Sequence, residues 1–130
     1  MLKQILNGRV LTPQGWLEGG SVIIDGNKIL AVSNSDLHIV DAEIIDAKGC
    51  YVVPGGVDMH AHGGGGRDFM EGTEEAFRVA IKAHMKHGTT SIFPTLSSST
   101  VPMIEAACET CEKLMAEENS PVLGLNLEGP

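Results

Sequence analysis

An alternation of strand-like and helix-like segments begins after Cys50, and it constrains the fold of this chain more than any other feature. The strand-like runs are short and apolar, whereas the segments between them repeat apolar side chains at the spacing of a helix face. In chain order we expect a strand at 51–60, a helix at 74–87, a strand at 89–93, a helix at 100–115 and a strand at 121–127. Such βα-type units, with parallel strands covered on both faces, predict either an open α/β sheet or the opening of a (β/α)8 barrel.

Residues 1–50 show a different pattern, because short β signals alternate there with turn residues. Asp25-Gly26-Asn27 separates two apolar runs, and Gly and Asn tolerate the positive φ of a tight hairpin turn. We therefore expect a small antiparallel β unit with exposed edges, too short to close a core alone. The chain divides on this basis into residues 1–52 and 53–130. Since a (β/α)8 barrel usually needs about 250 residues, the second part is expected to be an incomplete barrel.

The charge of the chain argues against two classes of partner. The formal net charge is −8 and the nine Lys and Arg are scattered, whereas nucleic acids and anionic membranes require a concentrated basic patch. No run approaches the ~20 apolar residues that span a bilayer, and no signal-peptide pattern opens the chain. We expect a cytoplasmic protein with no nucleic-acid or membrane partner, whose three cysteines are reduced thiols.

His60 and His62 form the clearest chemical motif of the sequence. They lie two residues apart at the end of a predicted strand, where a period of two directs both side chains to one face. Two imidazoles placed in this way can bind one metal ion such as Zn²⁺, Fe²⁺ or Co²⁺, and a carboxylate can complete or bridge the site. Glu128 occupies the equivalent place after the third predicted strand, so that we expect it to lie near the two histidines.

A simpler interpretation exists for each part of this motif. A bare pair of nearby histidines is most often a chance pair in an exposed turn, and a glutamate at a strand end is usually a solvated surface residue. The context favours a metal site, because an apolar strand and Asp58 precede the pair and Gly63 to Gly66 follow it. The glycine run lacks the spacing of a nucleotide-binding loop, so it predicts close backbone approach to a ligand or a flexible loop.

Three further motifs are expected to be structural. Cys108 and Cys111 match C-x-x-C, but they lie on the apolar stripe of a predicted helix with no second pair, which favours buried thiols. His84 falls on an apolar helix face and is interpreted as a core or interface histidine. His38 lies in a polar stretch and is expected at the surface.

With these residues identified, the chain resembles the amidohydrolase superfamily, and within it the N-acetylglucosamine-6-phosphate deacetylases. The resemblance covers the whole chain. The motifs that carry it are Pro-Gly-Gly-Val-Asp-Met-His-Ala-His-Gly at 54–63, His-Gly-Thr-Thr at 87–90, Phe-Pro-Thr-Leu at 93–96 and Leu-Asn-Leu-Glu-Gly-Pro at 125–130. The last two narrow the resemblance to the deacetylases.

The resemblance implies a β-sandwich to which residues 1–52 contribute, a metal-bearing (β/α)8 barrel that begins within 53–130, and a homodimer. It implies that His60 and His62 bind one divalent metal ion and that Glu128 is the carboxylate ligand, with one or two ions, Zn²⁺ or Fe²⁺, in each site. The implied reaction is hydrolysis of the acetamide of N-acetylglucosamine 6-phosphate, an amino-sugar phosphate.

The same resemblance places the catalytic aspartate and the phosphate-binding groups beyond residue 130, so that no catalytic residue is expected in this chain. Two alternatives stay open on the sequence. One is a related amidohydrolase acting on a cyclic amide, a dipeptide or a nucleobase. The other is a non-catalytic fragment that keeps the beginning of the fold without its chemistry.

Overall fold

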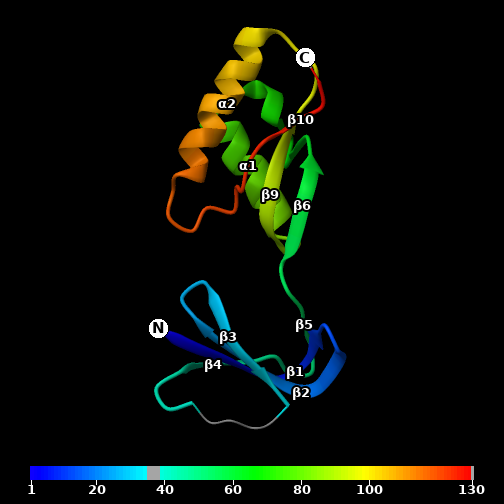
Figure 1. Ribbon diagram of the computed structural model, residues 1–130, viewed down its shortest axis with the longest axis vertical. Helices are drawn as coiled ribbons and strands as arrows, with labels where there is room; N and C mark the ends of the chain where they lie inside the picture. The colour runs from blue at the N-terminus through cyan, green and yellow to red at the C-terminus, as the bar shows by residue number, and fades with distance from the viewer. Residues whose placement is uncertain (35–38, 130) are drawn as a thin grey trace. The chain divides into compact units, whose positions relative to one another are not determined.

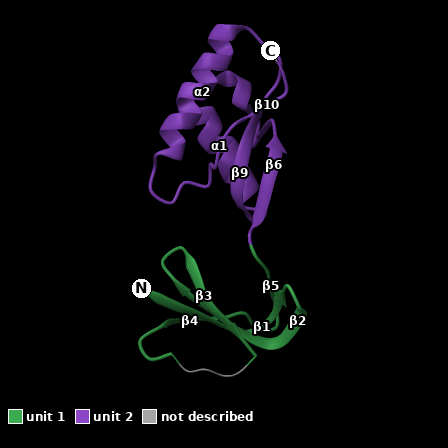
Figure 2. Ribbon diagram, in the orientation of Figure 1, with its two compact units in different colours: residues 1–54 green, residues 55–130 purple. Residues whose placement is uncertain are grey.

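A computed structural model describes residues 1–34 and 39–129, which form two compact units, Met1–Pro54 and Gly55–Pro130 (Figure 1, Figure 2). His38 lies outside the described residues, so its surface position stays a prediction. The units divide at Pro54–Gly55. No helix in the described ranges is long and apolar enough to cross a membrane.

The first unit is a five-stranded sheet. Its strands are β1 (Leu2–Thr12), β2 (Gly15–Asp25), β3 (Lys28–Ser33), β4 (Glu43–Asp46) and β5 (Tyr51–Val52), and the order is β3-β2-β1-β4 with β5 also paired to β1. The predicted hairpin is confirmed, because Asp25 pairs with Lys28 across a turn in which Gly26 has a φ of 57°. The prediction of an antiparallel unit is confirmed for β1, β2 and β3 but is wrong for the last two strands. β4 and β5 run parallel to β1, since the chain crosses from one sheet edge to the other after β3.

The second unit is a parallel three-stranded sheet with two helices. Its sheet has the order β10-β9-β6, and its elements are β6 (Gly56–Ala61), β7 (Gly63–Gly64), β8 (Arg67–Asp68), the 3-10 turn η1 (Phe69–Glu71), α1 (Glu74–Met85), β9 (Thr89–Leu96), α2 (Val101–Met115) and β10 (Asn126–Leu127). The predicted alternation is confirmed, but the strand bounds differ. β9 continues through Pro94 to Leu96, beyond the expected strand 89–93. The expected strand 51–60 is interrupted at residues 53–55, and of the expected strand 121–127 only β10 and a bridge at Val122 are formed.

Both helices lie against one face of this sheet (Figure 1). The three strands follow chain order across the sheet, and right-handed crossovers between successive parallel strands place α1 and α2 on the same side. Among the described residues, helices therefore cover one face of this sheet, as at the opening of a barrel. Val57 and Met59 of β6 are 61% and 68% exposed.

The core of the second unit lies between the helices and the sheet. α1 begins at the N-cap Thr73, whose hydroxyl accepts from the amide of Ala76 at 3.2 Å, and Gly88 with a φ of 95° lets the chain turn into β9. The carbonyl of Gly88 accepts from Gly56 N–H at 2.8 Å, which aligns the start of β6 with β9. The largest apolar side chains of this core with no exposed surface are Phe69, Phe77, Ile92 and Leu96.

Candidate metal centre

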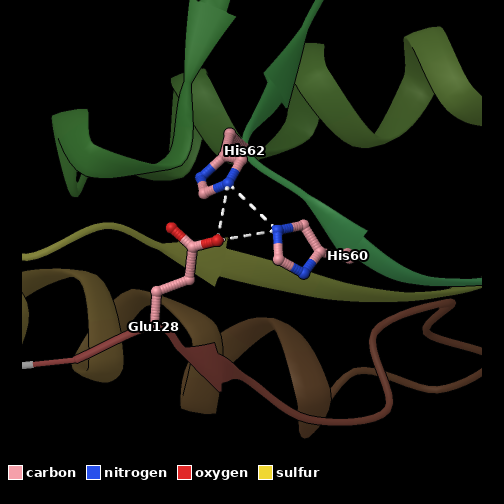
Figure 3. A group of neighbouring side chains, drawn as sticks. All are labelled: His60, His62 and Glu128. Atoms are coloured by element: carbon pink, nitrogen blue, oxygen red, sulfur yellow. Dashed lines mark hydrogen bonds and ion pairs between the residues drawn. The ribbon is translucent and has the colours of Figure 1, made fainter.

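His60, His62 and Glu128 meet at the carboxyl ends of β6 and β10 (Figure 3). Both strands flank β9 and run parallel to it, so their carboxyl ends reach the same edge of the sheet. This juxtaposition is the one that the strand pattern of the sequence predicted. The side chains are 56%, 39% and 39% exposed, respectively.

A β-bulge in β6 sets the direction of these histidines. Asp58 pairs with Ile92 and Ala61 pairs with Pro94, so β6 holds one more residue than β9 over this stretch. Ala61 is buried in the core on the helix side, and Asp58 also faces α1. His60, which a regular strand would place on the same face as Asp58, instead contacts Glu128.

The three ligand atoms form a compact triangle. Glu128 Oε1 lies 2.9 Å from His60 Nε2 and 3.4 Å from His62 Nε2, and the two Nε2 atoms are 3.2 Å apart (Figure 3). Ligand atoms around a tetrahedral zinc ion are about 3.3 Å apart, because Zn–N and Zn–O bonds are about 2.0–2.2 Å long. A circle through the three atoms has a radius of about 1.8 Å, so a point at bonding distance from all three exists.

The chemistry of the donors also suits a metal ion. Imidazole nitrogens and a carboxylate oxygen are the ligands of borderline divalent cations such as Zn²⁺ and Fe²⁺. Three atoms that carry lone pairs converge here. The residues present therefore fit a divalent metal ion.

Polar neighbours fix the ligands. Ser97, which follows β9, places its Oγ 3.3 Å from His62 Nδ1, so that the remaining nitrogen Nε2 faces Glu128. The amide of His60 donates to Asp58 Oδ1 at 3.1 Å. Sequence reasoning noted Asp58 only as context and missed Ser97. The one available signal was the position of Ser97 directly after a strand of the same parallel sheet.

The glycine run after the histidines forms an ordered hairpin. β7 pairs with β8 through Gly63↔Asp68 and Gly64↔Arg67, and the two glycines between them have positive φ values of 62° and 83°. A Cβ atom on Gly63 would lie 2.2 Å from the carbonyl oxygen of Arg67, so only glycine fits there. The run is therefore a paired hairpin that lies against α1 and not a loop without contacts.

The structure also places the motifs that were expected to be structural. All three cysteines are free, Cys111 is buried and Cys108 is half-buried on α2. Burial raises the pKa of the Cys111 thiol to about 11, which keeps it protonated at neutral pH. His84 is half-buried on α1 and contacts Asp58 and Gly63, so its interpretation as a core or interface histidine is incomplete.

Comparison with known proteins identifies the family. The amidohydrolase family model matches residues 51–126, more than half of the chain. The chain is 27% identical to N-acetylglucosamine-6-phosphate deacetylase of Lysinibacillus sphaericus over 128 residues, which are 97% of this chain and 33% of that protein. It is 45% identical to a dihydroorotase of Syntrophotalea carbinolica over 78 residues, which are 58% of this chain and 18% of that protein.

A solved structure extends this likeness to three dimensions. The crystal structure of N-acetylglucosamine-6-phosphate deacetylase from Pasteurella multocida matches with a TM-score of 0.91 at 26% identity, over 100% of this chain and 35% of that one. The chain spans about a third of the length of the deacetylases that it matches. From the family match and the strand-end histidine motif together, the chain belongs to the amidohydrolase family.

Proposed function

We propose that this chain is part of a metal-dependent deacetylase that hydrolyses N-acetylglucosamine 6-phosphate to glucosamine 6-phosphate and acetate. The observation that carries the proposal is the triangle of His60, His62 and Glu128 in a chain that resembles such deacetylases over almost its whole length. We further propose that these three residues hold one or two divalent ions, Zn²⁺ or Fe²⁺.

The proposed architecture is a (β/α)8 barrel together with a small β-sandwich. In it, residues 53–130 supply the first barrel units and residues 1–52 supply part of the sandwich. Parallel strands in chain order, with both helices on one face, support the barrel, because an open doubly wound sheet reverses its strand order and covers both faces. The exposed apolar residues Val57 and Met59 would then line the barrel interior.

The chemistry of the proposed reaction divides between the metal and the protein. A divalent ion supplies Lewis acidity, which polarises an amide carbonyl and makes water a nucleophile at neutral pH. His60 and His62 present Nε2 toward the ion position, and Ser97 supports this tautomer of His62 through Nδ1. Glu128 adds the negative charge that draws a cation to this edge of the sheet.

Proton transfer requires a group that we do not assign within this chain. Glu128 contacts the two histidines. Asp58 accepts from the amide of His60 and contacts the ring of His84, so we assign neither carboxylate as the general base. We propose that the general base is an aspartate on a late strand beyond residue 130.

The substrate phosphate also needs partners that we place beyond residue 130. Arg67, the cation nearest in sequence to the histidine pair, is held by Glu71 at 2.9 Å and by Glu75 at 2.8 Å. The proposal includes a small-molecule amino-sugar phosphate as substrate, a homodimeric assembly, and a cytoplasmic location without nucleic-acid or membrane partners.

A second function within the same family has a specific observation behind it. The dihydroorotase match has the higher identity, although it covers a shorter part of the chain. The histidine pair and its strand are shared across many amidohydrolases. His60 and His62 therefore do not distinguish N-acetylglucosamine 6-phosphate from dihydroorotate as the substrate.

The deciding experiment presents both substrates to the intact protein. Release of acetate from N-acetylglucosamine 6-phosphate and hydrolysis of dihydroorotate are measured with bound metal quantified, before and after treatment with a chelator. We expect acetate release that is lost with the metal and restored by Zn²⁺ or Fe²⁺.

The variants for this experiment are His60→Ala, His62→Ala and Glu128→Gln, with His87→Gln as the control. His87 is an exposed histidine after α1. We expect the three site variants to lose both metal and turnover, and the control to keep them. Turnover of dihydroorotate alone would replace the deacetylase proposal, and full activity in metal-free protein would contradict the metal centre.

A further inference from the structure

His84 reaches both ends of the segment that carries the metal-site histidines. Its Nδ1 lies 3.3 Å from Asp58 Oδ2, two residues before His60. Its Nε2 lies 2.9 Å from the carbonyl oxygen of Gly63, the residue after His62. One imidazole on α1 therefore contacts the chain on both sides of residues 60–62.

The contact with Asp58 continues directly to a metal-site residue. The second carboxylate oxygen of Asp58 accepts from the backbone amide of His60 at 3.1 Å. Asp58 faces α1 while His60 faces Glu128, because the bulge in β6 lies between Asp58 and Ala61 and separates the two directions. The bulge therefore allows Asp58 to link the His84 ring on α1 to the backbone of His60.

The contact with Gly63 depends on the close approach of the glycine hairpin to α1. A Cβ atom on Gly64 would lie 3.1 Å from the carbonyl oxygen of Ala80 and 3.2 Å from His84 Nε2. A larger residue at this position would push the hairpin away from the helix. Two glycines therefore let the chain after His62 come within hydrogen-bond distance of the ring.

His84 is well placed to act as a rigid support. Its helix neighbours Ala80 and Ile81 are buried in the core of the second unit, which fixes this turn of α1. The ring itself is 26% exposed and the Asp58 side chain 30%. Its two ring nitrogens face two oxygen atoms, one of the Asp58 carboxylate and one of the Gly63 carbonyl.

We propose that His84 is a positioning residue that holds the segment 60–62 at both ends, through the Asp58 carboxylate and the Gly63 carbonyl, and so sets the metal affinity of His60 and His62. The inference rests on the metal binding in the proposed function. His84 does not contact the ion position, so its effect passes through the backbone and through Asp58. Removing such supporting contacts typically weakens metal affinity by about 10–100-fold.

The experiment is a titration of the metal-free intact protein with Zn²⁺ in competition with a chromophoric chelator. The variants are His84→Leu, which removes both contacts, and His84→Gln, whose amide can still donate to one oxygen. His87→Gln is the matched control on the same part of the chain. We expect His84→Leu to bind Zn²⁺ about 10–100-fold more weakly than the unchanged protein, His84→Gln to fall between them, and the control to stay within about twofold.

A double-mutant cycle tests the route of the effect. Because His84 acts in part through Asp58, the Asp58→Ala and His84→Leu changes are expected to be non-additive, with the double variant losing less affinity than the product of the two single losses. The visible absorption spectrum of Co²⁺ in the site should change in intensity in both single variants. Fully multiplicative losses would contradict the route through Asp58.

A second measurement keeps the inference separate from the proposed function. Amide hydrogen exchange in metal-free protein reports the order of the segment directly, and we expect the His60 and Phe69 amides to exchange about tenfold faster in His84→Leu. If the unchanged protein binds no Zn²⁺, the proposed function fails and the exchange result alone decides the support role. Folded His84→Leu with unchanged exchange and unchanged Zn²⁺ affinity would overturn the inference. If His84→Leu does not fold, His84→Gln is judged by the same two criteria.

Discussion

Phe69→Ala is expected to loosen the backbone that follows the histidine segment by removing its anchor in the core. Phe69 has no exposed surface, and its ring packs edge-on against Phe77 with centroids 4.9 Å apart. Its amide donates to the carbonyl of His62 at 2.9 Å, so the ring and the metal-site segment are linked through one residue. Asp68 caps the same turn by accepting from the amide of Met70 at 2.7 Å.

The magnitude follows from the burial of the ring. Truncating a buried phenylalanine to alanine costs about 3–5 kcal/mol, of which an edge-to-face aromatic pair accounts for about 0.5–1.5 kcal/mol. Since about 1.4 kcal/mol corresponds to a factor of ten, the equilibrium constant for opening this region should rise roughly a hundredfold to several thousandfold. The ring-pair share is measured by combining Phe69→Leu with Phe77→Leu in a double-mutant cycle.

Amide hydrogen exchange followed by mass spectrometry is the suitable assay, because it reports the second unit separately from the rest of the protein. Peptides from η1 and α1 should lose protection by the factor given above, while peptides from β1 and β2 keep theirs. Val101→Ala is the control, since Val101 is 67% exposed and its truncation should change protection by less than about threefold. Protection in α1 that is equal in Phe69→Ala and the control would refute the idea that this ring anchors the turn.

Three further predictions concern single side chains. Ser97→Ala should weaken Zn²⁺ binding by about tenfold in a chelator competition, with an unchanged melting temperature, because His62 loses its partner at Nδ1. Gly63→Ala should lower the melting temperature of the intact protein, because the added Cβ meets a carbonyl oxygen at 2.2 Å; an unchanged melt would show that the hairpin can shift. Cys111 should resist alkylation at pH 8 while the exposed Cys50 reacts, as measured by mass spectrometry. Because burial raises the pKa of Cys111 to about 11 from an unfolded value of 9.0, the free energy of unfolding should fall as the pH rises through that interval.

The sequence predicted the elements of the second unit because their signals are local. Thr73 followed by two glutamates marked the start of α1, and β-branched residues marked β9. The meeting of Glu128 with the histidine pair was also predictable, since parallel strands joined by helices bring their carboxyl ends to one edge. Each of these inferences needs only spacing and the rules of chain connection.

The features that were not predicted depend on contacts between distant residues. β4 pairs in parallel with β1 because the chain passes from the sheet edge at β3 to the opposite edge. The residues of β4 alone do not indicate which strand it will pair with. Ser97 reaches His62 over 35 positions of sequence, and a serine after a strand carries no distinctive signal. The sequence 121–127 is apolar enough for a full strand, yet only Asn126–Leu127 pair as β10 and Val122 forms an isolated bridge.

The bulge in β6 shows how one strand can serve two sides of a sheet. In a regular strand, Asp58 and His60 share a face, so either Asp58 could not reach His84 on the helix side or His60 could not reach Glu128 on the other. The additional residue between Asp58 and Ala61 reverses the alternation once, and both contacts form. The ligands therefore face the open side of the sheet, while their supporting residues Asp58 and His84 lie on the helix side. A period-two pattern in sequence cannot reveal this reversal, because a bulge leaves residue types unchanged and alters only their pairing.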